Sequence, residues 1–436
     1  MRQARNSICR WRNNILQSIV YHDPFLKTDV YEWICGVIYG MQTGAADWKN
    51  TLAYMLTQKM GFYEVLNMES VYHQPELMIT ACTHVDDPLM KSRDSANRIK
   101  FCKMLTDEFD TKGAKVLSPE CPIDYLSMRI SMPDAETIAI DNQLKIIAYL
   151  EEQGLTDCNP SPTPITETIV EMLYENAHKG ERQTAAEQEQ TSRMLGQAMW
   201  LAQTTHPTIA PAVSIYASIL KAESRVKGGV KAMTHLFKYL KGTQDRCLMR
   251  EADCQTGLQI WSDADFAGLW ARGYDTTRER RSRTGTYITY NNVPVIWVSK
   301  FQKATCLSYK GDSEEQYIED MALSTANSEL WAGAETAKDA EKIKWVCEEM
   351  QIEVPSKLTL NIDAAAAIGF IDSTNKSSDI KTIDMRCEWV KMLRSRDRFA
   401  TCKVPGEINE ADFFTKILPG PAFKLAEDRM MKPLHK

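Results

Sequence analysis

Paired cysteines are missing from this sequence, and histidines are few. Its 12 cysteines are scattered with no C-x-x-C pair, and the 7 histidines do not cluster beside them. Because zinc ligands normally occur at close, regular spacings, this pattern argues against a zinc site. Reduced thiols fit an intracellular protein, so we expect a cytoplasmic or nuclear location.

The sequence also lacks long apolar runs and an excess of basic residues. No apolar run approaches the roughly 18 residues that span a bilayer, so we expect no membrane partner. The net charge of -6 argues against a nucleic-acid enzyme, since such proteins are usually basic. Local basic stripes matter more than the total, so this class stays open. The 436 residues, 44% of them hydrophobic, predict two or three globular domains.

Apolar spacing predicts alternating helices and strands along the chain. Helical spacing occurs at residues 48–60 and 144–154, and a longer helical region covers 191–239 with breaks near 206–207 and 227–229. Short apolar runs predict strands at 77–82, 258–261, 287–290, 293–298 and 358–362. A mixed strand-and-helix domain therefore closes the chain.

Four acidic residues in the last third lie where a metal site could form. Asp263 and Asp363 follow strand-like runs, whereas Glu329 and Asp412 open stretches with helical spacing. Carboxylates gathered in this way can hold two divalent ions about 3.5–4 Å apart, an arrangement suited to phosphodiester hydrolysis. Hard oxygen ligands favour Mg²⁺ or Mn²⁺. Asp265 remains an alternative to Asp263, because strand alternation places both on one side.

Two further groups of charged residues have competing interpretations. Asp86 and Asp87 follow a predicted strand; they could bind metal, but adjacent acids are more often solvated turn residues. Basic residues near the strands after Asp263 could contact a phosphate backbone or belong to a solvated hairpin. These are Arg278, Arg280, Arg281, Arg283, Lys300 and Lys303.

Ordered motifs in the closing region resemble the ribonuclease H domain of copia-type LTR retrotransposon Pol polyproteins. Residues 262–268 resemble the family's S-D-A-D-W-A-G, residues 281–287 its R-R-S-T-S-G-Y, and residues 295–300 its I-S-W-S-S-K. Glu329, Asp363 and Asp412 fall on acids of three further family motifs, and Asp412 lies in the one written A-D-I-L-T-K. The resemblance implies a ribonuclease H site formed by these three acids and Asp263.

Upstream motifs resemble the reverse transcriptase of the same family, in the same order. Residues 39–48 are similar to L-Y-G-L-K-Q-A-P-R-A-W, residues 84–87 to Y-V-D-D, and residues 239–243 to part of the connection. There are departures: His84 replaces the tyrosine of Y-V-D-D, and little sequence precedes Tyr39 for the family's first polymerase aspartate. Asp86 and Asp87 are therefore expected to be a polymerase remnant. The loop histidine of some ribonucleases H is also absent.

The resemblance implies an α+β protein in three segments. A truncated reverse-transcriptase palm and thumb would cover residues 1–175, a helical connection 176–257, and a ribonuclease H-like domain with a mixed sheet 258–436. We expect Mg²⁺- or Mn²⁺-dependent cleavage of RNA in RNA–DNA hybrids, with the ancestral RNA-directed DNA polymerase activity lost. Other Pol chains are possible partners. The alternatives are an inert transposon remnant and a non-catalytic nucleic-acid-binding module.

Overall fold

The strands predicted from short apolar runs are all present in the computed structural model of the chain. The structure describes residues 17–23, 28–34, 44–109, 113–220, 225–251, 254–266, 268, 282–302, 306–307, 317–318, 325–373 and 385–434. Among these residues, no helix combines the length and the apolar character needed to cross a bilayer. The acidic segment at residues 309–321 lies outside the described residues except for Tyr317 and Ile318.

The chain divides into two compact units, and the first comprises residues 1–114 with 349–351. It contains an antiparallel hairpin of β1 (Gln17–Asp23) and β2 (Thr28–Ile34), and an antiparallel sheet in the order β3-β4-β5-β6. The sheet strands are Tyr63–Glu64, Val71–Gln74, Ile79–His84 and Asp87–Ser92. Its helices are α1 (Gly44–Tyr54), which continues as a π-helical turn (Met55–Lys59), and α2 (Ser95–Glu108).

The second unit comprises residues 115–348 and 352–436 and contains most of the helices. They are α3 (Gln143–Glu152), α4 (Glu167–His178), α5 (Ala185–Thr204), α6 (Ala210–Ile219), α7 (Gly229–Gly242), α9 (Thr325–Glu349), α10 (Ala365–Asp372), α11 (Met385–Ser395) and α12 (Gly420–Met430). Short 3-10 turns are η2 (Pro207–Ile209), η3 (Gly406–Ile408) and η4 (Glu410–Phe414). The helical region predicted at 191–239 is thus α5, α6 and α7, broken where Pro207 and Gly228 predicted.

Local signals explain where these helices begin. Thr184 and Glu187 form a reciprocal capping box at the start of α5, which satisfies backbone N–H groups that have no partner within the helix. The helix therefore starts within the polar stretch 181–190. Gly228 precedes α7 with φ 96°, a left-handed conformation that glycine adopts without steric cost.

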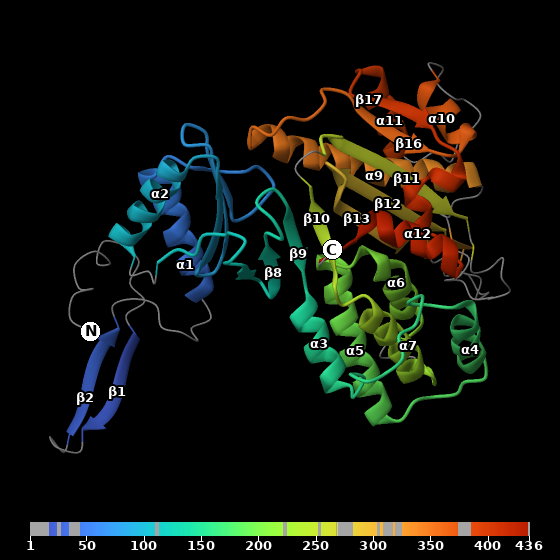
Figure 1. The fold of residues 1–436 in the computed structure, drawn as a ribbon, viewed down its shortest axis with the longest axis horizontal. Coiled ribbons are helices and arrows are strands. Elements are labelled where there is room, and N and C mark those ends of the chain that lie inside the picture. Colours follow the sequence, from blue (N-terminus) through green and yellow to red (C-terminus); the bar gives the residue numbers. More distant parts are fainter. Residues whose placement is uncertain are drawn as a thin grey trace. The chain divides into compact units, whose positions relative to one another are not determined.

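A five-stranded mixed sheet dominates the C-terminal part of the second unit (Figure 1). Its order is β13-β12-β11-β16-β17, with strands β11 (Leu258–Asp265), β12 (Arg283–Tyr290), β13 (Val293–Phe301), β16 (Leu358–Ile362) and β17 (Phe399–Lys403). Strands β11, β12 and β13 pair antiparallel, whereas β11–β16 and β16–β17 are parallel. The predicted mixed sheet is present, and the helices and several sheets together are compatible with the α+β expectation.

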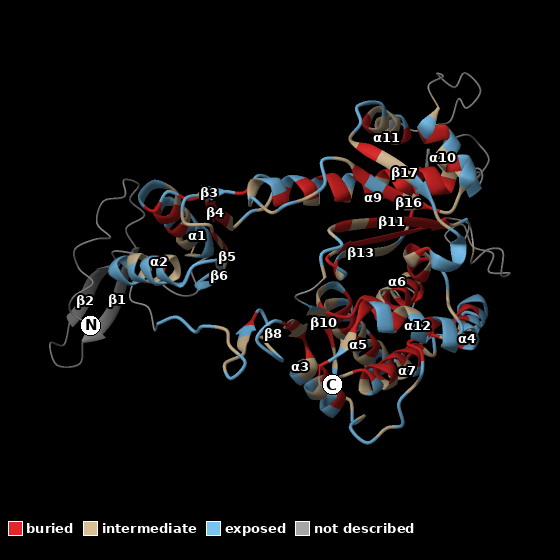
Figure 2. Cartoon of the chain, turned by 45° about the horizontal axis from the view of Figure 1, so that its top comes forward, coloured by how far each residue is buried: buried red, intermediate tan, exposed pale blue. Residues whose placement is uncertain are grey.

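Most residues of β11, at the centre of this sheet, are buried (Figure 2), and apolar side chains pack on both faces of the sheet. On one face, Leu330, Ala334 and Ala337 of α9 pack with Ile260 and Leu360 of the sheet. On the other face, Tyr287 packs with Phe413 and Phe414 in a core shared with α5, α6 and α7. The sheet is therefore held between a helical layer formed mainly by α9, α10 and α11 and a second layer built from η4 and the earlier helices.

A second sheet joins segments that are far apart in the sequence. Its order is β18-β10-β9-β8-β7, with strands Lys432–Pro433, Arg246–Arg250, Ile138–Asp141, Met128–Ser131 and Ile123–Tyr125. A short pair, β14 (Cys306–Leu307) with β15 (Tyr317–Ile318), lies apart from both sheets in the pairing scheme. The boundary between the compact units at 114–115 is not one of the predicted segment boundaries, and the three-segment division stays a prediction.

His206 is a buried titratable residue in the second unit. Its ring is fully buried at the start of η2, and its Nδ1 lies 2.9 Å from the Thr205 hydroxyl oxygen. Burial lowers the pKa of His206 to about 4, because a charged imidazolium is poorly solvated there. The unfolded chain therefore takes up this proton at a higher pH than the folded chain does.

We expect this contribution to the free energy of unfolding to be complete above pH 6.5 and to be lost as the pH falls toward 4. The loss amounts to about 3 kcal/mol, from 1.36 kcal/mol per pKa unit. Urea unfolding at several pH values should show a smaller acid-induced loss for His206→Gln than for the wild type. Exposed His178→Gln should keep the wild-type pH dependence. An unchanged dependence in His206→Gln would contradict the prediction.

Candidate metal centre

The parallel pairing of β11 with β16 brings two of the predicted acids together. Ile260 pairs with Leu360 and Trp261 with Asn361, so the same register places Asp263 beside Asp363 at the ends of adjacent strands. Glu329 approaches from the first turns of α9, whose buried face packs on this sheet. Oxygens of Asp263, Glu329 and Asp363 all lie within 4.8 Å of one another. We call these three residues the acidic trio.

Burial disfavours the ionised form of the acidic trio. Asp263 is 1% exposed and Glu329 is 4% exposed, whereas Asp363 is half-buried. Burial raises the pKa of Asp263 to about 7, and its hydrogen bond from Thr415 opposes this effect. Burial, followed by the charges of Asp263 and Asp363, raises the pKa of Glu329 to about 9. Gathering three carboxylates here costs free energy unless a cation is bound.

The donor chemistry of the acidic trio fits a hard divalent cation. All three side chains offer carboxylate oxygens, the ligands preferred by Mg²⁺ and Mn²⁺. The buried Glu329 Oε2 has no hydrogen-bond partner among the described residues, which leaves it available to a metal. Asp263 rather than Asp265 enters the trio, which decides between the two alternatives that strand alternation left open.

The fourth predicted acid lies close to the acidic trio without joining it. Asp412 belongs to η4, its negative charge contributes to the raised pKa of Asp263, and its carboxylate forms an ion pair with Lys416. The Thr415 hydroxyl hydrogen-bonds to Asp263 Oδ2. The sequence motif around Asp412 includes Thr415 and Lys416, which were not among the predicted site residues. Their spacing of three and four residues from Asp412 was the available signal.

Close packing holds η4 against the sheet. Asn409 Nδ2 donates to Ser262 O at 3.0 Å, and Asn409 Oδ1 accepts from Ala411 N at 3.2 Å. A Cβ placed on Gly285 of β12 would lie 2.6 Å from Ala411 O, closer than these atoms can approach. Glycine at this position therefore allows η4 to lie directly on β12 and brings Asp412 beside β11.

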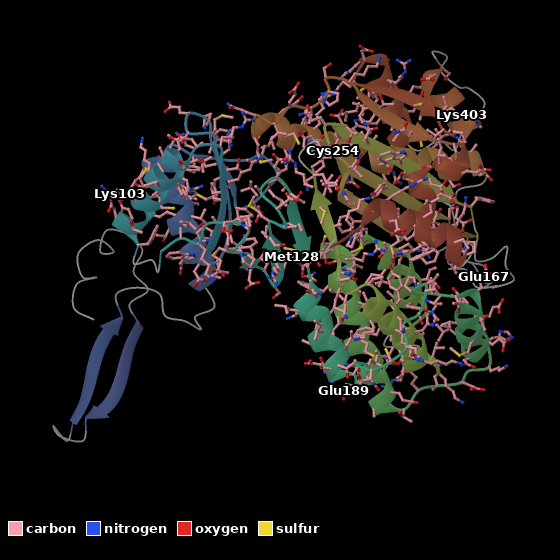
Figure 3. The ribbon with its side chains drawn as sticks, viewed as in Figure 1. Lys103, Met128, Glu167, Glu189, Cys254 and Lys403 are labelled. Carbon is pink, nitrogen blue, oxygen red and sulfur yellow. The ribbon has the colours of Figure 1, made fainter. Side chains whose placement is uncertain are left out.

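The loop after β17 encloses Asp363. Lys403, labelled in Figure 3, ends β17 and donates from Nζ to Asp363 O at 3.2 Å. A Cβ on Gly406 would lie 3.2 Å from Asp363 Oδ2, so this chain segment also approaches closely. The backbone at Gly406 and the side chain of Lys403 therefore border Asp363, whose carboxylate lies near those of the other two acids.

The predicted basic residues divide into three groups. Arg278, Arg280, Arg281 and Lys303 lie outside the described residues. Arg283 differs from the expected surface contact: it is 3% exposed, donates to Ser214 Oγ and Ser299 Oγ at 2.8 and 3.1 Å, and lies over the Phe301 ring. It ties β12 to α6 because strand alternation turns it inward. Lys300 is exposed and pairs with Glu335 at 3.0 Å.

Asp86 and Asp87 occupy an exposed hairpin in the first unit. His84 pairs with Asp87 across the ends of β5 and β6, and Val85 has φ 50° in the intervening turn. Both acids are exposed, and within the described part of the chain neither belongs to a group of three metal-ligating side chains. This is the turn geometry that the sequence predicted for the proposed polymerase remnant.

Comparisons with known proteins point to transposon Pol polyproteins. The chain is 25% identical over 350 residues to the retrovirus-related Pol polyprotein from transposon TNT 1-94 of Nicotiana tabacum, covering 79% of this chain and 24% of that protein. It is 20% identical over 403 residues to the transposon Ty1-DR5 Gag-Pol polyprotein of Saccharomyces cerevisiae, covering 90% of this chain and 21% of that protein. No family model matches the chain.

These relatives confirm the resemblance predicted from the ordered motifs. The chain is similar to Pol polyproteins of copia-type transposons, and the similarity covers most of its length at low identity. It spans about a quarter of the length of the tobacco relative and about a fifth of the yeast relative. The similarity supports a retrotransposon-derived chain.

Removing one buried acid from the acidic trio should stabilise the metal-free protein. With a chelator present, we expect Glu329→Gln to raise the free energy of unfolding by about 1–3 kcal/mol at pH 8, because it removes a buried acid with a raised pKa. Since a raised folded-state pKa lowers stability as the pH rises, the gain should be smaller at pH 5. Denaturant unfolding measures both values.

Glu341→Gln is the matched control for this prediction. Glu341 is also buried on α9, but its carboxylate is paired with Arg398. Glu341→Gln removes the acid and leaves the Arg398 guanidinium without its ion-pair partner, so this variant should give no stabilisation. Equal gains for the two variants would contradict an origin in the buried, unpaired carboxyl group of Glu329.

A substitution at Gly285 tests the close contact between β12 and η4. We expect Gly285→Ala to lower the free energy of unfolding by about 1–3 kcal/mol, because the added methyl group forces η4 away from the sheet. Gly369→Ala on α10 has open space and should be neutral or stabilising by up to about 1 kcal/mol. Urea unfolding compares them. Wild-type stability for Gly285→Ala would show that η4 does not pack there.

Proposed function

We propose that the chain cleaves the RNA strand of RNA–DNA hybrids at the acidic trio, with Mg²⁺ or Mn²⁺ as cofactor. The observation that carries this proposal is the convergence of Asp263, Glu329 and Asp363 from β11, α9 and β16. The Pol polyprotein relatives and the mixed sheet support a ribonuclease H-like domain in this part of the chain. The proposed substrate class is the hybrid formed during retrotransposon replication.

The roles of the residues follow from their charge and position. Asp263, Glu329 and Asp363 would hold the metal, with Asp412 as a fourth acid beside them. A bound divalent ion supplies Lewis-acid stabilisation of a phosphate oxygen and lowers the pKa of an attacking water. Lys300 lies on β13 opposite Thr284, which pairs with Ala264 beside Asp263, so its exposed ammonium group could contact a backbone phosphate near the centre.

Recognition of the RNA strand would depend on its 2′-hydroxyl groups, which distinguish RNA from DNA at a given position. Phosphate contacts would position the duplex without reading its sequence. Because the chain has a net charge of -6, such contacts must be local, and hybrid affinity should fall as salt increases.

Asp363→Asn tests the proposal directly. We expect the folded wild-type chain to cut the RNA strand of a labelled hybrid with Mg²⁺ or Mn²⁺. Asp363→Asn should lower the cleavage rate roughly a hundredfold or more, because the amide keeps the shape but loses the charge that holds the metal. Denaturing gel electrophoresis of the labelled RNA strand measures the rate.

Asp372→Asn is the matched control, since Asp372 pairs with Arg394 at the end of α10 and lies outside the acidic trio. It should retain wild-type cleavage. Equal cleavage by wild type and Asp363→Asn would indicate a contaminating nuclease. A folded wild-type chain that cuts nothing with either metal would favour an inert remnant, and metal-independent, salt-sensitive hybrid binding would favour a binding module.

A further inference from the structure

Lys416 is a cation built into the acidic centre. It lies one turn beyond Asp412, its backbone N–H donates to Asp412 O at 3.2 Å, and its ammonium group forms an ion pair with the Asp412 carboxylate. The Asp412 side chain is 20% exposed and that of Lys416 is 43% exposed. The pair is therefore partly sheltered and more persistent than a fully solvated surface pair.

The backbone that carries this ion pair is held firmly. Ala411, Phe413 and Phe414 are buried, and Phe414 stacks on Tyr287 with ring centroids 5.4 Å apart. The Thr415 hydroxyl between the two charged residues hydrogen-bonds to Asp263 Oδ2. These contacts fix the backbone of Lys416, and its partly exposed ammonium group interacts with the charges of Asp263 and Asp363.

The charge of Lys416 reaches beyond its direct partner. It opposes the rise in the pKa of both Asp263 and Glu329. Conversely, burial lowers the pKa of Lys416, but the hydrogen bond that its ammonium group donates to Asp412 and the charges of Asp263, Asp412 and Asp363 raise it above its ordinary value. One ammonium group thus compensates several carboxylates at once, as a bound cation would.

We propose that Lys416 acts as a resident counter-ion that withholds Asp412 from metal binding. Without nucleic acid, the centre then takes a single divalent cation at the acidic trio, and a second ion binds only when the Asp412–Lys416 pair is broken. This inference rests on the metal centre of the proposed function and extends it to the order in which the ions load. Lys416 thus acts through the Asp412 carboxylate and is a positioning residue.

Counting bound Mn²⁺ in the full chain tests this inference without measuring activity. Electron paramagnetic resonance of free Mn²⁺ during titration should show a single ion bound at the centre in the wild type. Lys416→Met and Lys416→Gln should each bind a second ion, because they release the Asp412 carboxylate while removing the competing charge. The double variant Asp412→Asn with Lys416→Met should return to a single ion.

Lys424→Met is the matched control, because Lys424 forms comparable ion pairs with Glu427 and Asp428 on α12. It should bind Mn²⁺ as the wild type does. Circular dichroism confirms that each variant is folded, and the two different neutral replacements guard against a single unfolded variant. A second ion that requires Asp412 and the absence of Lys416 supports the inference.

Other outcomes overturn it or separate it from the proposed function. Two ions in the wild type, no added ion in either Lys416 variant, or tighter binding of the first ion alone would refute the counter-ion role. A wild type that binds no Mn²⁺ refutes both the metal centre and this inference. A wild type that binds one ion but cuts no hybrid refutes the proposed nuclease activity while the result on Lys416 still stands.

Discussion

Burial of neighbouring carboxylates, together with their mutual repulsion, is the constraint on which the C-terminal part of this structure depends. Three acids meet within 4.8 Å at the ends of two strands and the start of a helix, and two of them are almost completely buried. Such an arrangement is unfavourable in isolation, because burial and like charge both oppose ionisation. The surrounding fold must therefore be stable enough to hold the acids together until a cation compensates them.

Apolar packing on both faces of the mixed sheet provides that stability. The helix that carries Glu329 packs through small and branched side chains, while Phe413 and Phe414 anchor the opposite face beside Tyr287. The acids thus occupy an edge at which two well-packed layers meet. The free energy gained by burying apolar side chains offsets the electrostatic cost of the acidic site. Functional sites commonly lower the stability of a fold in this way.

Packing between distant segments also decides the roles of polar residues that the local sequence does not predict. Arg283 faces inward because its strand position points to α6, and Ser214 of α6 and Ser299 of β13 accept its hydrogen bonds. Thr415 and Lys416 gain significance only because η4 lies against β11. Nothing in their local sequence reveals which carboxylates they will meet, since those come from elements far away in the chain.

The sequence by itself determined four of the five strands of the mixed sheet, the helix breaks and the four acidic candidates, because apolar periodicity, proline, glycine and carboxylate chemistry are local properties. It also carried the ordered motifs that identify transposon Pol relatives. Only the tertiary structure decided that Asp263 rather than Asp265 joins Glu329 and Asp363, and that Asp412 is paired with Lys416. Both results follow from the parallel pairing of β11 with β16 and from the contact of η4 with Gly285. These contacts depend on which distant segments of the chain pack together.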